Sequence, residues 1–254
     1  MEFFDVFMPV GRTNMAIPES PCTESQVLNL MDNYGVAEAL AFHTVSRDAD
    51  PDLGNSTLVK EISNPRLHRV WAFDSVFVKE ETPEKFLEKA LQNNVKAIMF
   101  NPHMRDVQIG RSIRLRELAV LLEKRRIPLL VTYRRYDAGQ DTINWYQLAD
   151  FCNAFPQLPV ISWEWRSRAN RPMFDALAST TNLRISFSSL WQSQILEQIC
   201  ESFGSQRLVF SLGLPLLDPG AFTPVIAYAG VEQAAKKAIA SDNIRQILSE
   251  ANYE

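Results

Sequence analysis

The sequence predicts an α/β protein built as a single (β/α)8 barrel. Eight short runs rich in β-branched and aromatic residues recur along it, most at intervals of about 25–35 residues, the spacing of repeated strand–helix units. Several runs are apolar throughout, as at residues 97–100 and 129–133, and strands covered on both faces require such continuous apolarity. Helical patterns separate the runs, and no Gly/Ser-rich linker divides the chain.

The first expected strand, Phe3–Pro9, is followed by a helix over Glu24–Asn33. Thr23 precedes this helix and Gln26 stands at its third position, which is the capping-box pattern. Gly35 supplies the residue type that ends many helices. The remaining expected strands are Glu38–His43, Arg69–Ser75, Val95–Asn101, Pro128–Arg134, Pro159–Trp165, Asn182–Ser188 and Leu208–Leu214.

Further helices are expected between these strands. Pro83 opens a helical pattern that includes the segment FLEKALQNN. Apolar residues at positions 115, 118, 121 and 122 define one face of a helix over Ile113–Arg126. Two more helical patterns cover Ser193–Ser202 and Val231–Leu248, and the second is expected to break near Ser241.

Length and composition favour one domain over residues 1–254. The chain is 46% hydrophobic and 22% charged, and α/β barrels commonly run to about 250 residues as one domain. Its net charge of −4 does not predict the phosphate binding of a nucleic-acid protein. We therefore expect no nucleic-acid partner.

The cysteines and the hydropathy pattern predict a cytoplasmic protein. Cys22, Cys152 and Cys200 are far apart and odd in number, which favours reduced thiols over disulfides or a metal site. No apolar run approaches the roughly 20 residues of a membrane span. Glu2 and Asp5 interrupt the apolar N-terminus, so no signal peptide and no membrane contact are expected.

A motif near the C-terminus carries a family resemblance. Residues 208–219 read LVFSLGLPLLDP and align without a gap with the last-strand motif of the amidohydrolase superfamily, roughly LLFGSDYPFLDP. The two share the Phe, the first Pro and the closing Leu-Asp-Pro. The chain thus resembles this superfamily, and most of all its branch of metal-dependent hydrolases and decarboxylases that includes aminocarboxymuconate-semialdehyde decarboxylase. The resemblance implies an amidohydrolase-like TIM barrel rather than the alternative, an open doubly wound sheet.

The resemblance also implies a metal site, but the chain does not keep its ligands. The family's His-x-His pair after the first strand falls on Phe7 and Pro9. Its ligands on the fifth, sixth and eighth strands fall on Thr132, Glu164 and Gly213. A zinc site needs at least three protein ligands, and this set offers a single carboxylate. We therefore expect no metal and no other cofactor.

Glu164 is the strongest candidate for acid–base chemistry. Desolvation among Phe7, Trp163 and Trp165 would raise the pKa of its carboxyl group, whereas a nearby guanidinium would lower it. A structural salt bridge is the competing interpretation.

Two arginines predict an anion site near Glu164. Arg134 and Arg166 lie two positions beyond Thr132 and Glu164, and positions two apart on a strand share a face. Guanidinium groups bind carboxylate or phosphate in a bidentate manner. The competing interpretation is that the arginines form a salt bridge with Glu164 or extend into solvent. The expected substrate-binding residues are Arg134, Arg166, Thr132, Phe7, Trp163, Asn101 and Ser188.

Two histidines and one aspartate complete the candidate catalytic set. His43 and His103 follow the second and fourth strands, where either could transfer protons near neutral pH. Asp74 ends the third strand and could orient His43 or bind a substrate hydroxyl. Hydrogen-bonded structural histidines and a capping Asp are the competing interpretations.

Two functions from different classes remain open. The first is a hydrolase or decarboxylase that acts without the family's metal on a small anionic, carboxylated molecule. The second is a non-catalytic relative that binds a small molecule or a partner protein. A metal site would persist only if three of His43, Asp74, His103 and Glu164 converged. Related barrels often pair through their helices, so analogy favours a homodimer.

Overall fold

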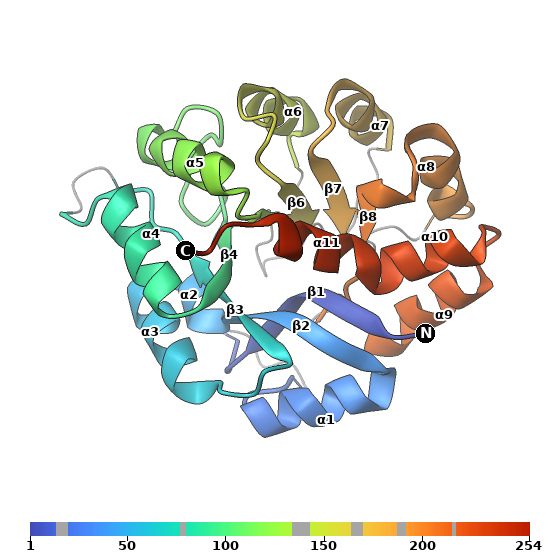
Figure 1. Ribbon diagram of the computed structural model, residues 1–254, viewed down its shortest axis with the longest axis horizontal. Coiled ribbons are helices and arrows are strands. Elements are labelled where there is room, and N and C mark those ends of the chain that lie inside the picture. Colours follow the sequence, from blue (N-terminus) through green and yellow to red (C-terminus); the bar gives the residue numbers. More distant parts are fainter. Residues whose placement is uncertain (14–19, 77–79, 134–142, 164–169, 187–191, 215–216) are drawn as a thin grey trace.

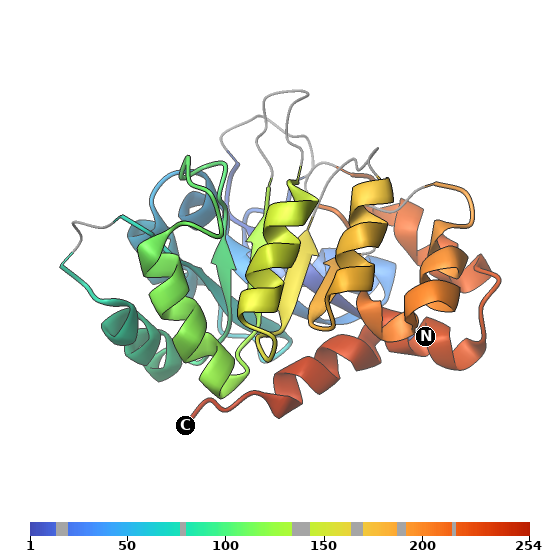
Figure 2. The same ribbon diagram turned by 90° about the horizontal axis from the view of Figure 1, so that it is seen from above.

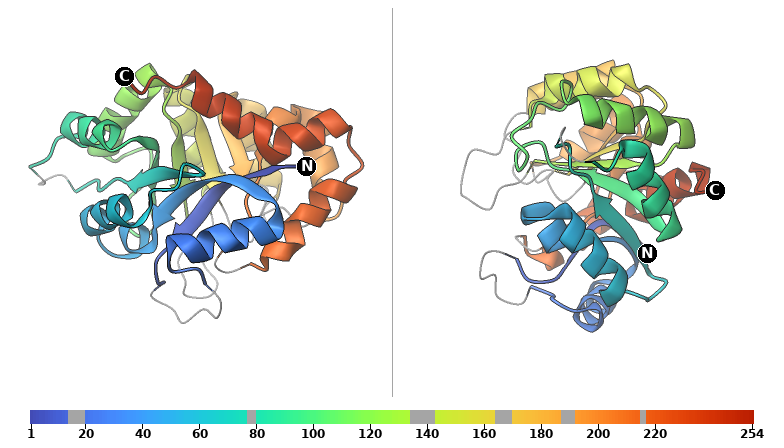
Figure 3. Two further views of the ribbon diagram at one scale, coloured as in Figure 1. Left: turned by 60° about the horizontal axis from the view of Figure 1, so that its bottom comes forward. Right: turned by 90° about the vertical axis from the view of Figure 1, so that its left-hand side faces the viewer.

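Eight parallel strands form one sheet in the order β1-β2-β3-β4-β5-β6-β7-β8, and helices surround the strands on the outside (Figures 1 and 3). The architecture is the predicted (β/α)8 barrel. The computed structural model describes residues 1–254 except 14–19, 77–79, 134–142, 164–169, 187–191 and 215–216.

The elements alternate along the chain as expected. The strands are β1 (Phe3–Val10), β2 (Val36–His43), β3 (Leu67–Ala72), β4 (Val95–Phe100), β5 (Leu129–Thr132), β6 (Val160–Trp163), β7 (Leu183–Ser186) and β8 (Leu208–Val209). The helices are α1 (Glu24–Tyr34), α2 (Thr44–Asp48), α3 (Pro51–Glu61), α4 (Pro83–Gln92), α5 (Ile113–Arg125), α6 (Trp145–Ala154), α7 (Asn170–Ser179), α8 (Ile195–Phe203), α9 (Phe222–Tyr228), α10 (Gln233–Lys237) and α11 (Asn243–Glu250).

Local signals in the sequence set the ends of α1 and the break in the last helix. The Thr23 side chain accepts the Gln26 N–H, and the Gln26 side chain bonds back to the Thr23 backbone, so the predicted capping box is confirmed. Gly35 ends the helix with φ 69° in the left-handed region. The break expected near Ser241 is a π-helical turn over Ala238–Asp242, between α10 and α11.

The sequence patterns did not predict α3, because polar contacts rather than an apolar face hold it. Asn55 is buried at 4% exposure. Its side-chain amide donates to the Ala72 carbonyl and its oxygen accepts the Ala72 N–H, both at 2.9 Å. Gly54 lets α3 approach α2 closely, since an added Cβ would lie 2.1 Å from the backbone nitrogen of Ser46.

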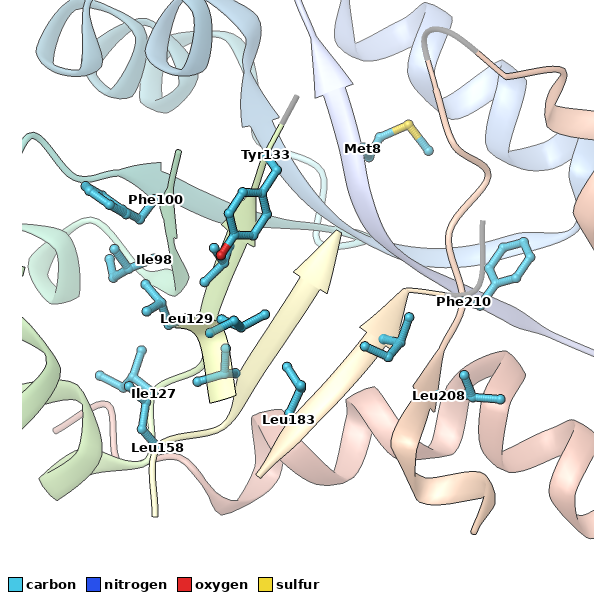
Figure 4. Close-up of a cluster of buried hydrophobic side chains, with 14 of the residues drawn as sticks. Met8, Ile98, Phe100, Ile127, Leu129, Tyr133, Leu158, Leu183, Leu208 and Phe210 are labelled. Carbon is cyan, nitrogen blue, oxygen red and sulfur yellow. The ribbon is translucent and has the colours of Figure 1, made fainter. Parts of the chain in front are cut away.

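Two apolar layers hold the barrel together. The outer layer lies between the strands and the surrounding helices, and Figure 4 shows part of it around β5, β6 and β7. The inner layer fills the barrel itself. Its strand residues are Phe4, Val6, Phe7, Leu40, Phe42, Val70, Ala72, Ala97, Met99, Leu130, Ile161, Trp163 and Val209. The barrel is therefore a packed core, as is usual for this fold.

The C-terminal helix covers the end of the barrel at which the strands begin. Figure 2 shows α11 running across that end. Ile244 and Ile247 on α11 join the inner apolar layer with 1% and 5% exposure. Among the described helices, none is both long enough and apolar enough to cross a membrane.

The seam between the first strand and the segment after β8 is closed by a buried carboxylate. The backbone N–H of Val6 donates to the Phe210 carbonyl at 3.0 Å. The Asp5 carboxylate accepts the Phe7 N–H at 2.8 Å and the Leu212 N–H at 3.1 Å. Asp5 is fully buried, so it joins β1 to the end of the last barrel segment inside the protein.

Replacing Asp5 with Asn tests how the seam depends on this charge. Burial raises the pKa of Asp5 to about 6, although hydrogen bonds from Phe7 and Leu212 lower it. The folded protein therefore binds this proton more tightly than the unfolded chain. The contribution of Asp5 to the free energy of unfolding therefore falls by on the order of 3 kcal/mol as the pH rises from about 4 to about 6. We expect this fall to be absent in D5N, measured by urea denaturation.

The exposed Asp218 provides the matched control, because its carboxylate accepts only a local turn hydrogen bond from Gly220. D218N should keep the pH dependence of the wild type. An equal pH dependence in D5N and in the wild type would contradict the assignment of the titration to Asp5.

Candidate functional site

Aromatic side chains fill the barrel interior toward the carboxyl-terminal ends of the strands, where barrel enzymes carry their active sites. The rings of Phe7 and Trp163 stack with centroids 4.1 Å apart and an interplanar angle of 16°. The Phe42 ring lies 4.4 Å from Phe7. All three side chains have 0% exposure. Phe7 and Trp163 thus lie together as expected, as a solid aromatic stack that fills the interior.

A buried cation lies beside this stack, and the sequence analysis missed it. The guanidinium of Arg47 on α2 is 5.3 Å from the Phe42 ring centre and 5.9 Å from that of Phe7. Cations over aromatic faces are attracted by the ring quadrupole. The Arg47 side chain also donates to both carboxylate oxygens of Asp48, at 2.5 and 2.9 Å. No motif marks Arg47, and the only sequence signal is its position soon after a strand.

Thr132 and Ser211 add hydroxyl groups around Trp163. Thr132 pairs with Trp163 in the β5–β6 register and is fully buried. Its hydroxyl has no hydrogen-bond partner among the residues that the structure describes. The Trp163 indole N–H donates to the Ser211 hydroxyl at 3.4 Å, and the Gly213 N–H donates to the same oxygen at 3.2 Å. The inner wall near Trp163 is therefore polar as well as aromatic.

His43 faces away from the barrel interior, unlike the expectation that it lines the mouth. On β2, Leu40 and Phe42 belong to the inner layer and Ala41 to the outer layer. Because side chains alternate along a strand, His43 shares the outer face with Ala41. The same alternation could have given this orientation from the sequence.

The hydrogen bonds of His43 are structural. Its Nδ1 accepts the Val45 N–H at 3.2 Å and so caps the start of α2. The proton of the neutral ring is thereby assigned to Nε2, which lies 3.4 Å from a Glu61 carboxylate oxygen. Burial lowers the pKa of His43, although Glu61 raises it. The carboxylate partner of His43 is thus Glu61, whereas Asp74 was the one expected.

The other described candidates lie in turns after β3 and β4. The Asp74 carboxylate accepts the Val76 N–H at 3.2 Å. The Asn101 side-chain oxygen accepts the Met104 N–H at 3.0 Å. The His103 ring packs edge-on against Tyr133 with centroids 5.3 Å apart. The Asp74 contact fits the interpretation of this residue as a capping Asp.

Four expected site residues lie outside the described part of the chain, and their geometry stays a prediction. They are Glu164, Arg134, Arg166 and Ser188.

The described residues do not fit the metal site that the resemblance implies. Phe7 is committed to an aromatic stack, and Pro9 offers no ligand atom. Gly213 has φ +76°, and a Cβ added there would lie 2.6 Å from Cδ1 of Leu217, so a side chain is poorly accommodated. Within the described ranges, nowhere do three His, Cys, Asp or Glu side chains come together to hold a metal.

Comparison with known proteins defines the class of fold. No protein-family model matches the chain, and a search of curated proteins gives no match. Solved structures do match, and these are TIM barrels of the amidohydrolase superfamily. The fold resemblance predicted from the sequence motifs is therefore confirmed.

Three solved structures illustrate the match. The 5-carboxyvanillate decarboxylase from Sphingomonas paucimobilis is 15% identical with a TM-score of 0.68, covering 98% of this chain and 99% of its own. The 2,6-dihydroxybenzoate decarboxylase from Rhizobium is 14% identical with a TM-score of 0.69 and the same coverage. The dihydroxybenzoic acid decarboxylase from Polaromonas sp. JS666, with bound manganese and the inhibitor 2-nitroresorcinol, is 11% identical with a TM-score of 0.73, covering 98% and 97%. At these identities the likeness shows the fold alone.

Arg47→Met tests whether the cation beside the aromatic stack stabilises the fold. The substitution leaves the Asp48 carboxylate, whose side chain is 7% exposed, without its cation. Breaking a buried ion pair in this way costs about 3 kcal/mol or more, and we expect that loss in urea denaturation. Lys237→Met is the control, because both side chains of the Lys237–Asp242 pair are well exposed and its loss should cost below about 1 kcal/mol. Equal losses would contradict a stabilising role for Arg47.

Gly213→Asp tests whether the family's ligand can be restored. We expect the variant to lose about 1–2 kcal/mol of unfolding free energy, because the positive φ and the contact with Leu217 disfavour any side chain. Gly213→Ala should show a similar loss. Gly110→Ala should not, since nothing lies within 4 Å of its added Cβ. A stable Gly213→Asp that retains stoichiometric metal by elemental analysis would show instead that the site can still be rebuilt.

Proposed function

We propose that the protein is a metal-independent decarboxylase or hydrolase of the amidohydrolase type that acts on a small carboxylated aromatic molecule. The observation that carries the proposal is the stack of Phe7, Trp163 and Phe42, which occupies the region where the resemblance implies metal ligands. Sites for small molecules are typically lined by aromatic side chains and a few polar groups, and in the proposed site this stack lies beneath the substrate. The substrates named for similar structures, 5-carboxyvanillate and 2,6-dihydroxybenzoate, support this chemical class.

The proposed roles follow from charge and position in the sequence. Arg134 and Arg166 hold the substrate carboxylate, and Thr132, which has no partner among the described residues, supplies a hydroxyl. Glu164 transfers the proton. In a decarboxylation, protonated Glu164 would give its proton to the ring carbon, the bond from that carbon to the carboxylate would break, and CO2 would leave. His43 is left out of this scheme because it faces the outer layer.

Full burial of the aromatic stack favours a second candidate, a non-catalytic relative that binds a small molecule or a partner protein. Phe7 and Trp163 have no exposed surface, so they fill the space in which a substrate would otherwise lie. In this case Glu164 and the arginines serve stability alone.

The experiment is a turnover assay with 2,6-dihydroxybenzoate as probe, before and after dialysis against a chelator. We expect CO2 release that survives dialysis and that falls by about 100-fold or more in Glu164→Gln, which removes the proton donor. Circular dichroism should show that this variant remains folded. Glu117→Gln, at an exposed position of α5, is the matched control and should keep full activity.

The alternative outcomes separate the candidates. Activity that is lost on dialysis and restored by manganese or zinc would contradict metal independence. Saturable binding of the probe without turnover, with a change only in stability for Glu164→Gln, would support the non-catalytic relative.

A further inference from the structure

A cavity lies at the end of the barrel at which the strands begin. It has a volume of about 260 Å³ and lies between the first residues of the strands and the C-terminal segment. Its lining residues are Phe4, Glu38, His68, Lys96, Arg245, Leu248, Ser249 and Tyr253. The volume is at the lower limit of typical ligand pockets, so only a small molecule would fit.

Most charges around this cavity neutralise one another. The Glu38 carboxylate accepts from His68 at 2.8 Å and from Arg245 at 2.9 Å. Arg245 also pairs with Glu2 at 3.3 Å. Burial raises the pKa of Glu38, whereas the hydrogen bonds from His68 and Arg245 lower it by a larger amount. The pKa of Glu38 is therefore lowered overall. The network ties α11 to β2 and β3.

Lys96 is the charged lining residue that takes no part in these ion pairs. Its ammonium lies 4.1 Å from the centre of the Tyr253 ring, and the Tyr253 hydroxyl donates to the Lys96 carbonyl at 3.0 Å. Among the described carboxylates, none forms an ion pair with Lys96. Partial burial lowers the pKa of Lys96 because no counter-charge offsets the lost water. An anion in the cavity would supply that counter-charge.

Planar rings and one aliphatic side chain form the part of the wall that lies beside these ion pairs. The His68 ring stacks on Phe4 with centroids 5.4 Å apart and an interplanar angle of 12°. Leu248 and the Tyr253 ring complete the apolar surface. An ammonium that forms no ion pair with the described carboxylates, beside planar rings, matches a ligand with one negative charge and a flat apolar body.

We propose that this cavity binds a small monocarboxylate with a planar apolar body. The carboxylate pairs with the Lys96 ammonium, and the body packs against His68, Leu248 and Tyr253. The site is separate from the mouth of the barrel, because the inner apolar layer from Phe4 to Trp163 fills the space between them. Binding in this cavity is therefore independent of the activity proposed for the mouth.

Nuclear magnetic resonance of the intact protein tests this site with benzoate as probe. The lysines are labelled by reductive ¹³C-methylation, and the Lys96 signal is assigned by its loss in Lys96→Arg. We expect benzoate to shift the Lys96 signal saturably and to raise the pH at which it titrates, because the anion stabilises the charged amine. The signal of Lys124, which is exposed on α5, should not shift saturably.

Two comparisons make the outcome decisive. Inorganic phosphate carries charge without an apolar body and should bind at least fivefold more weakly than benzoate. In Lys96→Met, benzoate should no longer perturb the ring signals of Tyr253. Absence of a saturable Lys96 shift, an equal shift at Lys124, or equal binding of phosphate would each overturn the proposal.

Discussion

The buried Asp5 carboxylate is the contact on which the barrel depends. A sheet of eight strands becomes a barrel only if its first and last segments are joined, and β8 itself contributes just Leu208–Val209. Beyond β8, Asp5 accepts the Leu212 N–H while also holding the Phe7 N–H. The cost of burying this charge appears in the raised pKa of Asp5. The contact fixes Phe7, and with it the aromatic stack, at the mouth.

Aromatic packing and one arginine stabilise the barrel interior around Phe7. Offset or stacked aromatic pairs contribute about 0.5–1.5 kcal/mol beyond their burial, and Phe7 makes two such contacts. Arg47 brings positive charge to the same rings, with Asp48 as its counter-charge. The described interior is thus stabilised by aromatic packing and by the buried Arg47–Asp48 ion pair.

Apolar runs and local caps predicted the fold well, whereas contacts between residues far apart in the chain could not be predicted from the sequence. The strands and the α1 cap follow from continuous apolarity and from the Thr23–Gln26 pattern. Helix α3 was not predicted, because Asn55 stabilises it through hydrogen bonds to the backbone of Ala72. The strand expected over Leu208–Leu214 is shorter because Asp5 and Ser211 side chains, in place of a neighbouring strand, accept the Leu212 and Gly213 N–H groups.

The sequence predicted part of the aromatic interior but not the cation beside it. The sequence indicated that Phe7 and Trp163 would meet, because both lie at strand positions facing the interior. It could not indicate Arg47, whose approach to Phe7 and Phe42 depends on how α2 turns after β2. Lys96 at the other end repeats the arrangement, with its cation over the Tyr253 ring. A packed core separates the two ends, so the two cations differ in their surroundings: Arg47 pairs with Asp48, whereas Lys96 lies over the Tyr253 ring and forms no ion pair with the described carboxylates.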